Sequence, residues 1–323
     1  MDKKKLNWIY KKLFTIRFFE ERIKKIAKEK TVPGYLHTCI GSEAICVGVM
    51  AALNNDDWIS STYRNHGHAI AKDCDLKKIT SEIYGRKTGI CKGRGGSMHI
   101  SDFDKGMLGS FGIVAAGPPV VLGAALQEKI NNGKKMSVSF FGDGAIHNGA
   151  FHEAAGLAQL WNIPMLFVCE NNGYAEATAT DWHLNTKELS DISKAYDMKS
   201  YQGNGNDVFE VYKITNEAII ESKDNEIPIF LEFKNYRFSG QYEGDTQLYQ
   251  PKEEIENAKK NDPIKLAIEN SQARGLEYSE IEQIQNEAFR EVNEAFDFAD
   301  TQPWPEPEDA LNEVYVNYPK EII

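Results

Sequence analysis

The sequence lacks the features that mark secreted, membrane-spanning or nucleic-acid-binding proteins. Its five cysteines are odd in number and form no Cys-x-x-Cys pair, which favours reduced thiols in a cytoplasm over a disulfide framework. No apolar run approaches the roughly 18 residues of a membrane span, and no apolar segment follows the first lysines as in a signal peptide. The formal net charge of −11 provides no basic excess for nucleic acid. We therefore expect a cytoplasmic protein without membrane or nucleic-acid partners.

Patterns typical of zinc sites are also scarce. His66 and His68 are two residues apart in a stretch that reads as a loop, with no cysteine or carboxylate immediately beside them. His152-Glu153 lacks the second histidine of a zinc-protease helix. Neither pattern is sufficient to predict a zinc site.

The most informative stretch is a predicted strand-helix-strand unit in the middle of the chain. An apolar run over 138–141 ends in Gly142-Asp143-Gly144, helical spacing of apolar residues covers 148–161, and a second apolar run covers 164–168. Strands joined by one crossover helix are parallel neighbours. The sequence therefore predicts an α/β fold with a parallel sheet and helices on both faces.

Polar residues follow both strands of this unit. Asp143 follows the first strand and Asn171-Asn172 follows the second, so both should lie at the carboxyl edge of the sheet, where α/β proteins bind ligands. Carboxylate, amide and backbone carbonyl oxygens suit Mg²⁺ or Ca²⁺, and Mg²⁺ usually shares its coordination with substrate phosphates. An ordinary turn with a capping aspartate is the alternative for Gly-Asp-Gly alone, but the 26 residues between Gly144 and Asn171 fit the complete unit.

The rest of the chain predicts one α/β domain over 1–300 with a C-terminal helical cap, followed by a tail over 301–323. The glycine-rich stretch 85–117 reads as a long functional loop. Further helices are expected over 6–30, 44–53, 118–130, 189–196, 208–222, 255–270 and 279–299, and further strands over 58–62, 198–201 and 228–233.

Motifs along most of the chain resemble the alpha subunits of the two-subunit 2-oxo acid dehydrogenases and of the related acetoin dehydrogenase, which use thiamine diphosphate. Gly-Asp-Gly followed by Asn-Asn is the thiamine-diphosphate signature. The other matching residues are His37 with 41–44, 63–67, 85–87, 92–99, 112–114 and 236–237.

The resemblance implies a thiamine-diphosphate-binding fold, here its diphosphate-binding half, and a set of site residues. Mg²⁺ would be held by Asp143, Asn172 and the carbonyl of Tyr174. The remaining cofactor contacts would come from Tyr63 and Arg64 at the diphosphate, Gly112 and Val114 at the aminopyrimidine, and Gly144 and Ala145 in the signature turn. His37 would lie near the thiazolium as a catalytic residue.

The resemblance also implies partners. In this family the glutamate that activates the cofactor belongs to a beta subunit, so a heterotetramer of two alpha and two beta subunits is expected. Together they would cleave acetoin or decarboxylate a small 2-oxo acid, and pass the acyl or aldehyde unit to a lipoylated dihydrolipoyl acyltransferase.

One loop departs from the pyruvate-type pattern. Where those enzymes have His-Gly-His, this chain has Ser239-Gly240-Gln241, and a serine supplies neither a cation nor acid-base chemistry unaided at neutral pH. The loop resembles acetoin dehydrogenase more closely. We assign Ser239 as a second catalytic residue and keep two alternatives, an acyloin-forming transferase and a non-catalytic scaffold.

Overall fold

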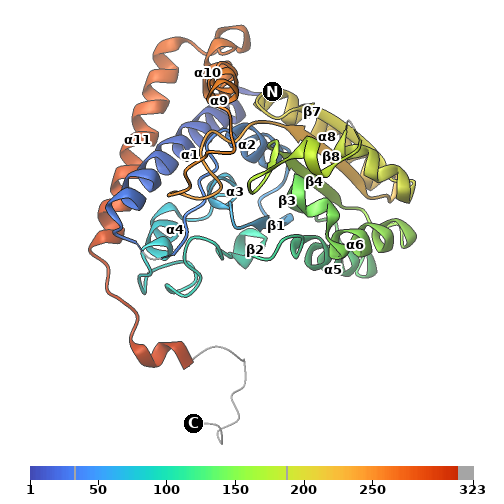
Figure 1. Cartoon of the computed structure of the whole chain (residues 1–323), viewed down its shortest axis with the longest axis horizontal. Coiled ribbons are helices and arrows are strands. Elements are labelled where there is room, and N and C mark those ends of the chain that lie inside the picture. The colour runs from blue at the N-terminus through green and yellow to red at the C-terminus, as the bar shows by residue number, and fades with distance from the viewer. Residues whose placement is uncertain (33, 187, 312–323) are drawn as a thin grey trace, which may run out of the picture.

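A computed structural model describes residues 1–32, 34–186 and 188–311 of the chain. Its centre is a six-stranded sheet in the order β2-β1-β3-β4-β8-β7, and every neighbouring pair is parallel (Figure 1). A short antiparallel pair, β5 with β6, lies apart from it. The strands are β1 Trp58–Thr62, β2 Met107–Phe111, β3 Ser137–Gly142, β4 Leu166–Asn171, β5 Tyr174–Ala175, β6 Thr178–Ala179, β7 Lys199–Asn204 and β8 Ile229–Lys234.

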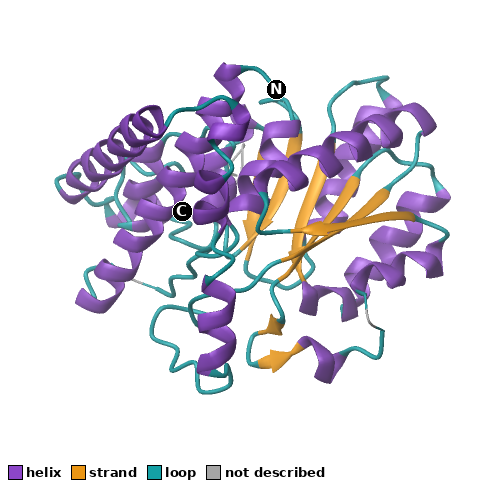
Figure 2. Ribbon diagram, turned by 90° about the horizontal axis from the view of Figure 1, so that it is seen from above, coloured by secondary structure: helices purple, strands orange, loops and turns teal. Residues whose placement is uncertain are grey.

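Helices cover both faces of the sheet, as Figure 2 shows, which confirms the predicted fold class. The α-helices are α1 Lys3–Glu29, α2 Glu43–Ala52, α3 His66–Ala71, α4 Leu76–Ile83, α5 Gly117–Ile130, α6 Gly149–Leu160, α7 Thr180–His183, α8 Val208–Asn225, α9 Lys252–Lys259, α10 Pro263–Glu269 and α11 Tyr278–Asp300. Short 3₁₀ helices span Phe103–Lys105, Asp143–His147, Leu189–Tyr196, Gln272–Arg274 and Pro307–Leu311.

Alternating side chains of the central strands divide the core in two. On β4, Leu166 and Val168 point into the cluster formed with α1, α2 and α8, whereas Phe167 and Cys169 point into the cluster formed with α5 and α6. Successive side chains of a strand face opposite sides of the sheet. A continuous apolar run therefore indicates a strand that is buried on both faces. The apolar runs over 138–141 and 164–168 are of this kind.

Helix α11 runs alongside α1 and also packs against α4 (Figure 1). Its buried residues Ala288, Val292, Phe296 and Ala299 belong to the same core cluster as α1. Part of the predicted tail, 301–311, lies within the described residues, and 312–323 lie outside them. None of the helices over the described ranges is both long and apolar enough to cross a bilayer.

Three local predictions were wrong, and a fourth was right in its bounds but not in its helix type. The predicted helix over 255–270 is divided into α9 and α10, because Asp262 caps the second helix and Pro263 begins it. The segment 189–196 is a 3₁₀ helix. The stretch 85–117 contains strand β2, which pairs with β1. The two histidines read as a loop pair lie on helix α3.

The glycine-rich segment is organised around one buried carboxylate. Glu82, at the end of α4, is fully buried, and its two oxygens accept four backbone N–H bonds of 2.7–3.0 Å. The donors are Cys91, Gly93, Gly95 and Gly96. The segment is thus shaped by a side chain from outside it.

Candidate functional site

A cavity of about 400 Å³ opens at the carboxyl ends of β3 and β4. The first wall of the cavity, here called the sheet edge, comprises the turns that follow these two strands. The second, here called the loop wall, is formed by segments 37–42 and 237–250, which contribute His37, Arg237 and Gln241 to the lining. The cavity lining includes ten residues expected at the site: His37, Tyr63, Arg64, Gly112, Val114, Asp143, Gly144, Ala145, Asn172 and Tyr174.

The sheet edge positions Asp143 through backbone register. Strand β3 pairs with β4 so that Gly142 is opposite Glu170, and Asp143 follows as a buried residue, only 1% exposed. Its Oδ2 accepts a 2.8 Å hydrogen bond from the Thr180 hydroxyl. A Cβ built on Gly142 would meet no other atom within 4 Å, so this glycine leaves open space beside the carboxylate.

The two adjacent asparagines have different partners. Asn171 donates from Nδ2 to Oε1 of the buried Glu232 at 2.8 Å, and it does not line the cavity. Asn172 lines the cavity, and its Oδ1 accepts from the backbone N–H of Tyr174 at 3.2 Å. Gly173, between Asn172 and Tyr174, has φ +85°, a conformation that favours glycine. The fold therefore directs one of the two amide groups toward the ligand space.

The loop wall is organised around the backbone carbonyl of Gln241. This oxygen accepts from Arg64 at 2.9 Å and from Nδ1 of His37 at 2.8 Å. Because a carbonyl can only accept, Nδ1 of His37 carries the proton, and Nε2 presents a lone pair. Burial, together with the positive charge of Arg64, lowers the pKa of His37 to about 4. The imidazole is therefore neutral near pH 7.

Sequence reasoning overlooked Arg237 as a site residue. It lines the cavity, is only 2% exposed, and has its pKa lowered by burial and by the charge of Arg64. Its guanidinium donates to the carbonyls of Ser239 and Glu176 and to the Tyr249 hydroxyl. The available signal was the Tyr-Arg pair at 236–237.

Ser239 is not brought to the cavity. It is 4% exposed, and its hydroxyl lies 3.0 Å from the donating ammonium of Lys24 on α1. The neighbouring Gln241 lines the cavity instead. The catalytic role assigned to Ser239 thus gains no support from the geometry.

A second overlooked group lies beside Asp143. Thr180 and His183 come from the segment read as a polar loop, and His183 Nε2 is 3.9 Å from Asp143 Oδ2. His183 Nδ1 is in turn 3.0 Å from His147 Nε2. No sequence pattern links these residues to the signature, because α7 is held there by tertiary packing.

The donor set of the cavity fits a metal-bound diphosphate. Oxygen groups suited to a hard cation lie at the sheet edge, and two buried guanidinium groups, which suit phosphate oxygens, face them. Beside Gly112, Ile113 and Val114 are 76% and 47% exposed, so apolar surface remains uncovered at this cavity.

Comparison with known proteins supports the same conclusion. The family described as "Dehydrogenase E1 component" matches residues 11–308. The acetoin:2,6-dichlorophenolindophenol oxidoreductase alpha subunit of Bacillus subtilis (strain 168) is 40% identical over 321 residues, covering 99% of this chain and 96% of the relative. Its counterpart in Cupriavidus necator is 40% identical over 322 residues, with 98% and 96% covered. The pyruvate dehydrogenase E1 component alpha subunit of Rickettsia bellii is 34% identical over 311 residues, with 95% and 94% covered.

The resemblance stated from the motifs is therefore confirmed. The chain belongs to the dehydrogenase E1 component family of oxidoreductases, and that membership implies thiamine diphosphate as its cofactor.

Proposed function

We propose that this chain is the alpha subunit of a cytoplasmic dehydrogenase that cleaves acetoin with Mg²⁺ and thiamine diphosphate. One observation carries the proposal: a single cavity is lined by Asp143 and Asn172 of the sheet edge and by the two arginines, Arg64 and Arg237. The two relatives at 40% identity are both named as acetoin oxidoreductase alpha subunits, which favours acetoin as the substrate.

Three oxygens of the sheet edge would hold the metal ion: the Asp143 carboxylate, the Asn172 amide oxygen and the Tyr174 carbonyl. All are hard ligands of the kind that Mg²⁺ takes, and diphosphate oxygens would supply further ligands. Arg64 would bind the diphosphate, since its hydrogen bonds to the carbonyls of Thr38 and Gln241 use only two of its five N–H donors within the part of the chain that the structure describes. Tyr63, Gly144 and Ala145 would complete this end, and Gly112 and Val114 the aminopyrimidine end.

The cofactor, when bound, supplies the carbon nucleophile that adds to the substrate carbonyl. His37 contributes an acid-base group whose tautomer is fixed, because Nδ1–H is held by the Gln241 carbonyl. Its Nε2 would accept the proton of the acetoin hydroxyl, a role that a neutral imidazole performs and an imidazolium does not. The low pKa of His37, about 4, therefore suits the step.

A beta subunit would complete the site in a heterotetramer. The exposed Ile113 and Val114 are suited to burial by a second chain at the cavity. The acyl or aldehyde unit would then pass to the lipoyl group of a dihydrolipoyl acyltransferase. Pyruvate is the second candidate substrate, because an alpha subunit named for pyruvate dehydrogenase is 34% identical.

The test is a substrate comparison on the chain copurified with its beta subunit. Reduction of 2,6-dichlorophenolindophenol would be followed with acetoin and with pyruvate, with and without Mg²⁺ and thiamine diphosphate. We expect kcat/KM for acetoin to exceed that for pyruvate at least tenfold, and the chain alone to be inactive. The reverse preference would exclude acetoin as the principal substrate. Tight cofactor binding without turnover of acetoin or pyruvate, with either the dye or a lipoyl domain as acceptor, would favour the acyloin-forming transferase.

A further inference from the structure

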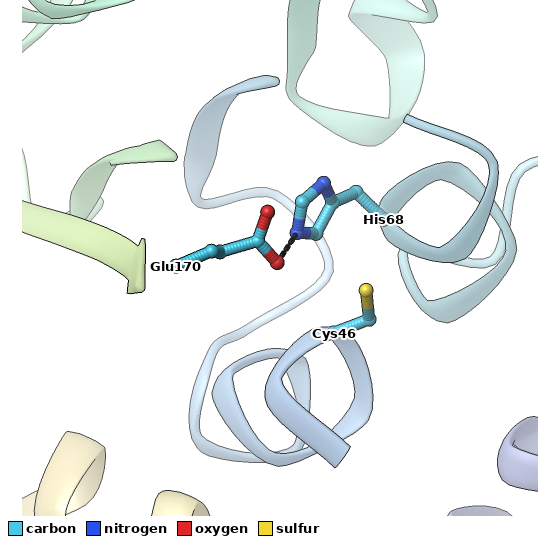
Figure 3. A group of neighbouring side chains, drawn as sticks. All are labelled: Cys46, His68 and Glu170. Atoms are coloured by element: carbon cyan, nitrogen blue, oxygen red, sulfur yellow. Dashed lines mark ion pairs between the residues drawn. The ribbon is translucent and has the colours of Figure 1, made fainter. Parts of the chain in front are cut away.

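Three ionisable side chains meet in the core below the cavity, and the proposed chemistry uses none of them. Cys46 comes from α2, His68 from α3 and Glu170 from β4 (Figure 3). Cys46 and His68 are fully buried and Glu170 is 5% exposed. Their Sγ, imidazole nitrogen and carboxylate oxygen all lie within 4.8 Å of one another. We call these three residues the buried triad.

Two atoms of the buried triad lack a hydrogen-bond partner. His68 Nε2 and Glu170 Oε1 face each other at 3.4 Å, and neither has such a partner among the residues that the structure describes. The other ring nitrogen, Nδ1, is 2.7 Å from the Ser61 hydroxyl, which can accept its proton. When Nδ1 carries the proton, Nε2 and Oε1 direct lone pairs at one another, and this arrangement costs free energy unless a proton or a metal cation lies between them.

We propose that Cys46, His68 and Glu170 bind one Zn²⁺ ion. Thiolate and imidazole ligands select Zn²⁺ over Mg²⁺, whose ligands are oxygens. A thiolate and a carboxylate carry two negative charges, which a dication cancels, so the filled site is neutral in the protein interior. A tetrahedral zinc holds such ligands roughly 3.3–3.8 Å apart, so an adjustment of about an ångström closes the triad on the ion.

The surroundings meet the other requirements of a zinc site. A histidine that binds zinc usually donates its second N–H to a fixed acceptor, and Ser61 is placed to receive it. Ser61 and Glu170 also line the cavity, which gives the ion an entry path and gives water the fourth coordination position. The ion would tie α2 and α3 to the end of β4 from which Asn172 projects.

A proton competes with the metal ion for the space between His68 Nε2 and Glu170 Oε1. Although burial alone would lower it, the charges of Cys46 and Glu170 raise the pKa of His68 to about 10. A protonated His68 beside an ionised Glu170 would satisfy the same two atoms without metal. The two states differ in metal content and in whether Cys46 is a ligand, so both can be measured.

The experiment is performed on the full chain copurified with its beta subunit, with no substrate present. Zinc is counted by mass spectrometry, and the metal is then exchanged for Co²⁺ to record the visible spectrum. We expect one zinc per alpha chain and a thiolate-to-cobalt charge-transfer band. Cys46→Ala should lose the band and weaken zinc binding about 100-fold or more.

Cys39→Ala is the matched control. Cys39 is also buried in this neighbourhood, since a Cβ on Gly67 would lie 2.8 Å from its sulfur and 2.7 Å from that of Cys46. It lies outside the triad and should keep both zinc and the band. If Cys46→Ala fails to fold, Ser61→Ala tests the site in its place, because this smaller change leaves the three ligands intact. It should weaken zinc binding about 10- to 100-fold.

A folded wild-type complex with neither stoichiometric zinc nor a thiolate-to-cobalt band would overturn the proposal. The His68–Glu170 ion pair would then be the state of the site. Equal metal loss in Cys39→Ala and Cys46→Ala would also overturn it. Because no step of the test uses acetoin or the cofactor, its outcome is independent of the proposed function.

Discussion

The sheet edge and the loop wall border the same cavity but are built in different ways. At the sheet edge, parallel register places Asp143 beside the end of β4, and its side chain faces the ligand space. At the loop wall, no regular strand sets the geometry. Side chains bind the backbone carbonyls of this wall, as when His37 and Arg64, which follows β1, both donate to the Gln241 carbonyl.

This difference separates side chains that act on a ligand from side chains that hold the backbone. Backbone hydrogen bonds support the sheet edge, so a substitution there should remove a ligand contact and spare the fold. In the loop wall, the buried guanidinium of Arg237 holds three groups, so its loss should disturb the fold as well. The following predictions test this contrast.

The largest effect is expected for Asp143→Ala. The variant should bind thiamine diphosphate at least about 100-fold more weakly, since loss of an outer ligand partner alone typically costs 10- to 100-fold. Calorimetry on the alpha–beta complex with Mg²⁺ measures it, and thermal unfolding should stay close to wild type. Thr180→Val, which removes only the hydroxyl that bonds Asp143, should show a smaller loss. Wild-type affinity in Asp143→Ala would disprove the metal assignment.

His37→Asn should lower kcat about 100-fold, the usual contribution of a positioned acid-base group, with little change in cofactor affinity. The pKa of about 4 lies below the usual value near 6.5. The neutral, active form therefore persists as pH falls and is lost only near pH 4. The unfolded chain takes up this proton near pH 6.5, so the contribution of neutral His37 to the free energy of unfolding declines as the pH falls from about 6.5 to about 4. A fall in kcat/KM near pH 6.5 that disappears in the variant would contradict this.

Arg237→Met should lower the free energy of unfolding by about 2–4 kcal/mol, because buried carbonyls lose charged donors. Hydrogen exchange should increase over 237–250, whereas at the sheet edge it should not change. Arg290→Met is the control, since Arg290 is 69% exposed and pairs only with Glu294 on its own helix in the described structure. An equal increase in hydrogen exchange at the loop wall and at the sheet edge would mean that the two walls do not fold independently.

The smallest effects are expected for Gln241→Ala and Ser239→Ala. Gln241 supports the site through its main chain, and the Ser239 hydroxyl bonds Lys24 outside the cavity. Each variant should keep kcat/KM within about threefold. A loss above tenfold in Ser239→Ala, measured with lipoyl domain as acceptor, would restore the catalytic role assigned to it.

The sequence determined the parts of the site whose geometry depends on residues close together in the chain. The strand-helix-strand spacing placed Asp143 and Asn172 on one sheet edge, because parallel neighbours end at the same side. The motifs that resemble the family predicted eight further residues that line the cavity, from His37 to Tyr174. These residues follow regular elements or lie in contiguous motifs, so their neighbours along the chain carry the signal.

Only the tertiary structure decided the long-range polar contacts. The sequence does not reveal that Glu82 orders the glycine-rich segment, that the Gln241 carbonyl fixes the tautomer of His37, or that Arg237 holds the loop wall. His68 has no ligand partner beside it in the sequence, yet the fold brings it to Cys46 and Glu170. Hydrophobic periodicity specifies how elements pack. It does not specify which buried polar atoms then meet, because that depends on the positions of several elements at once.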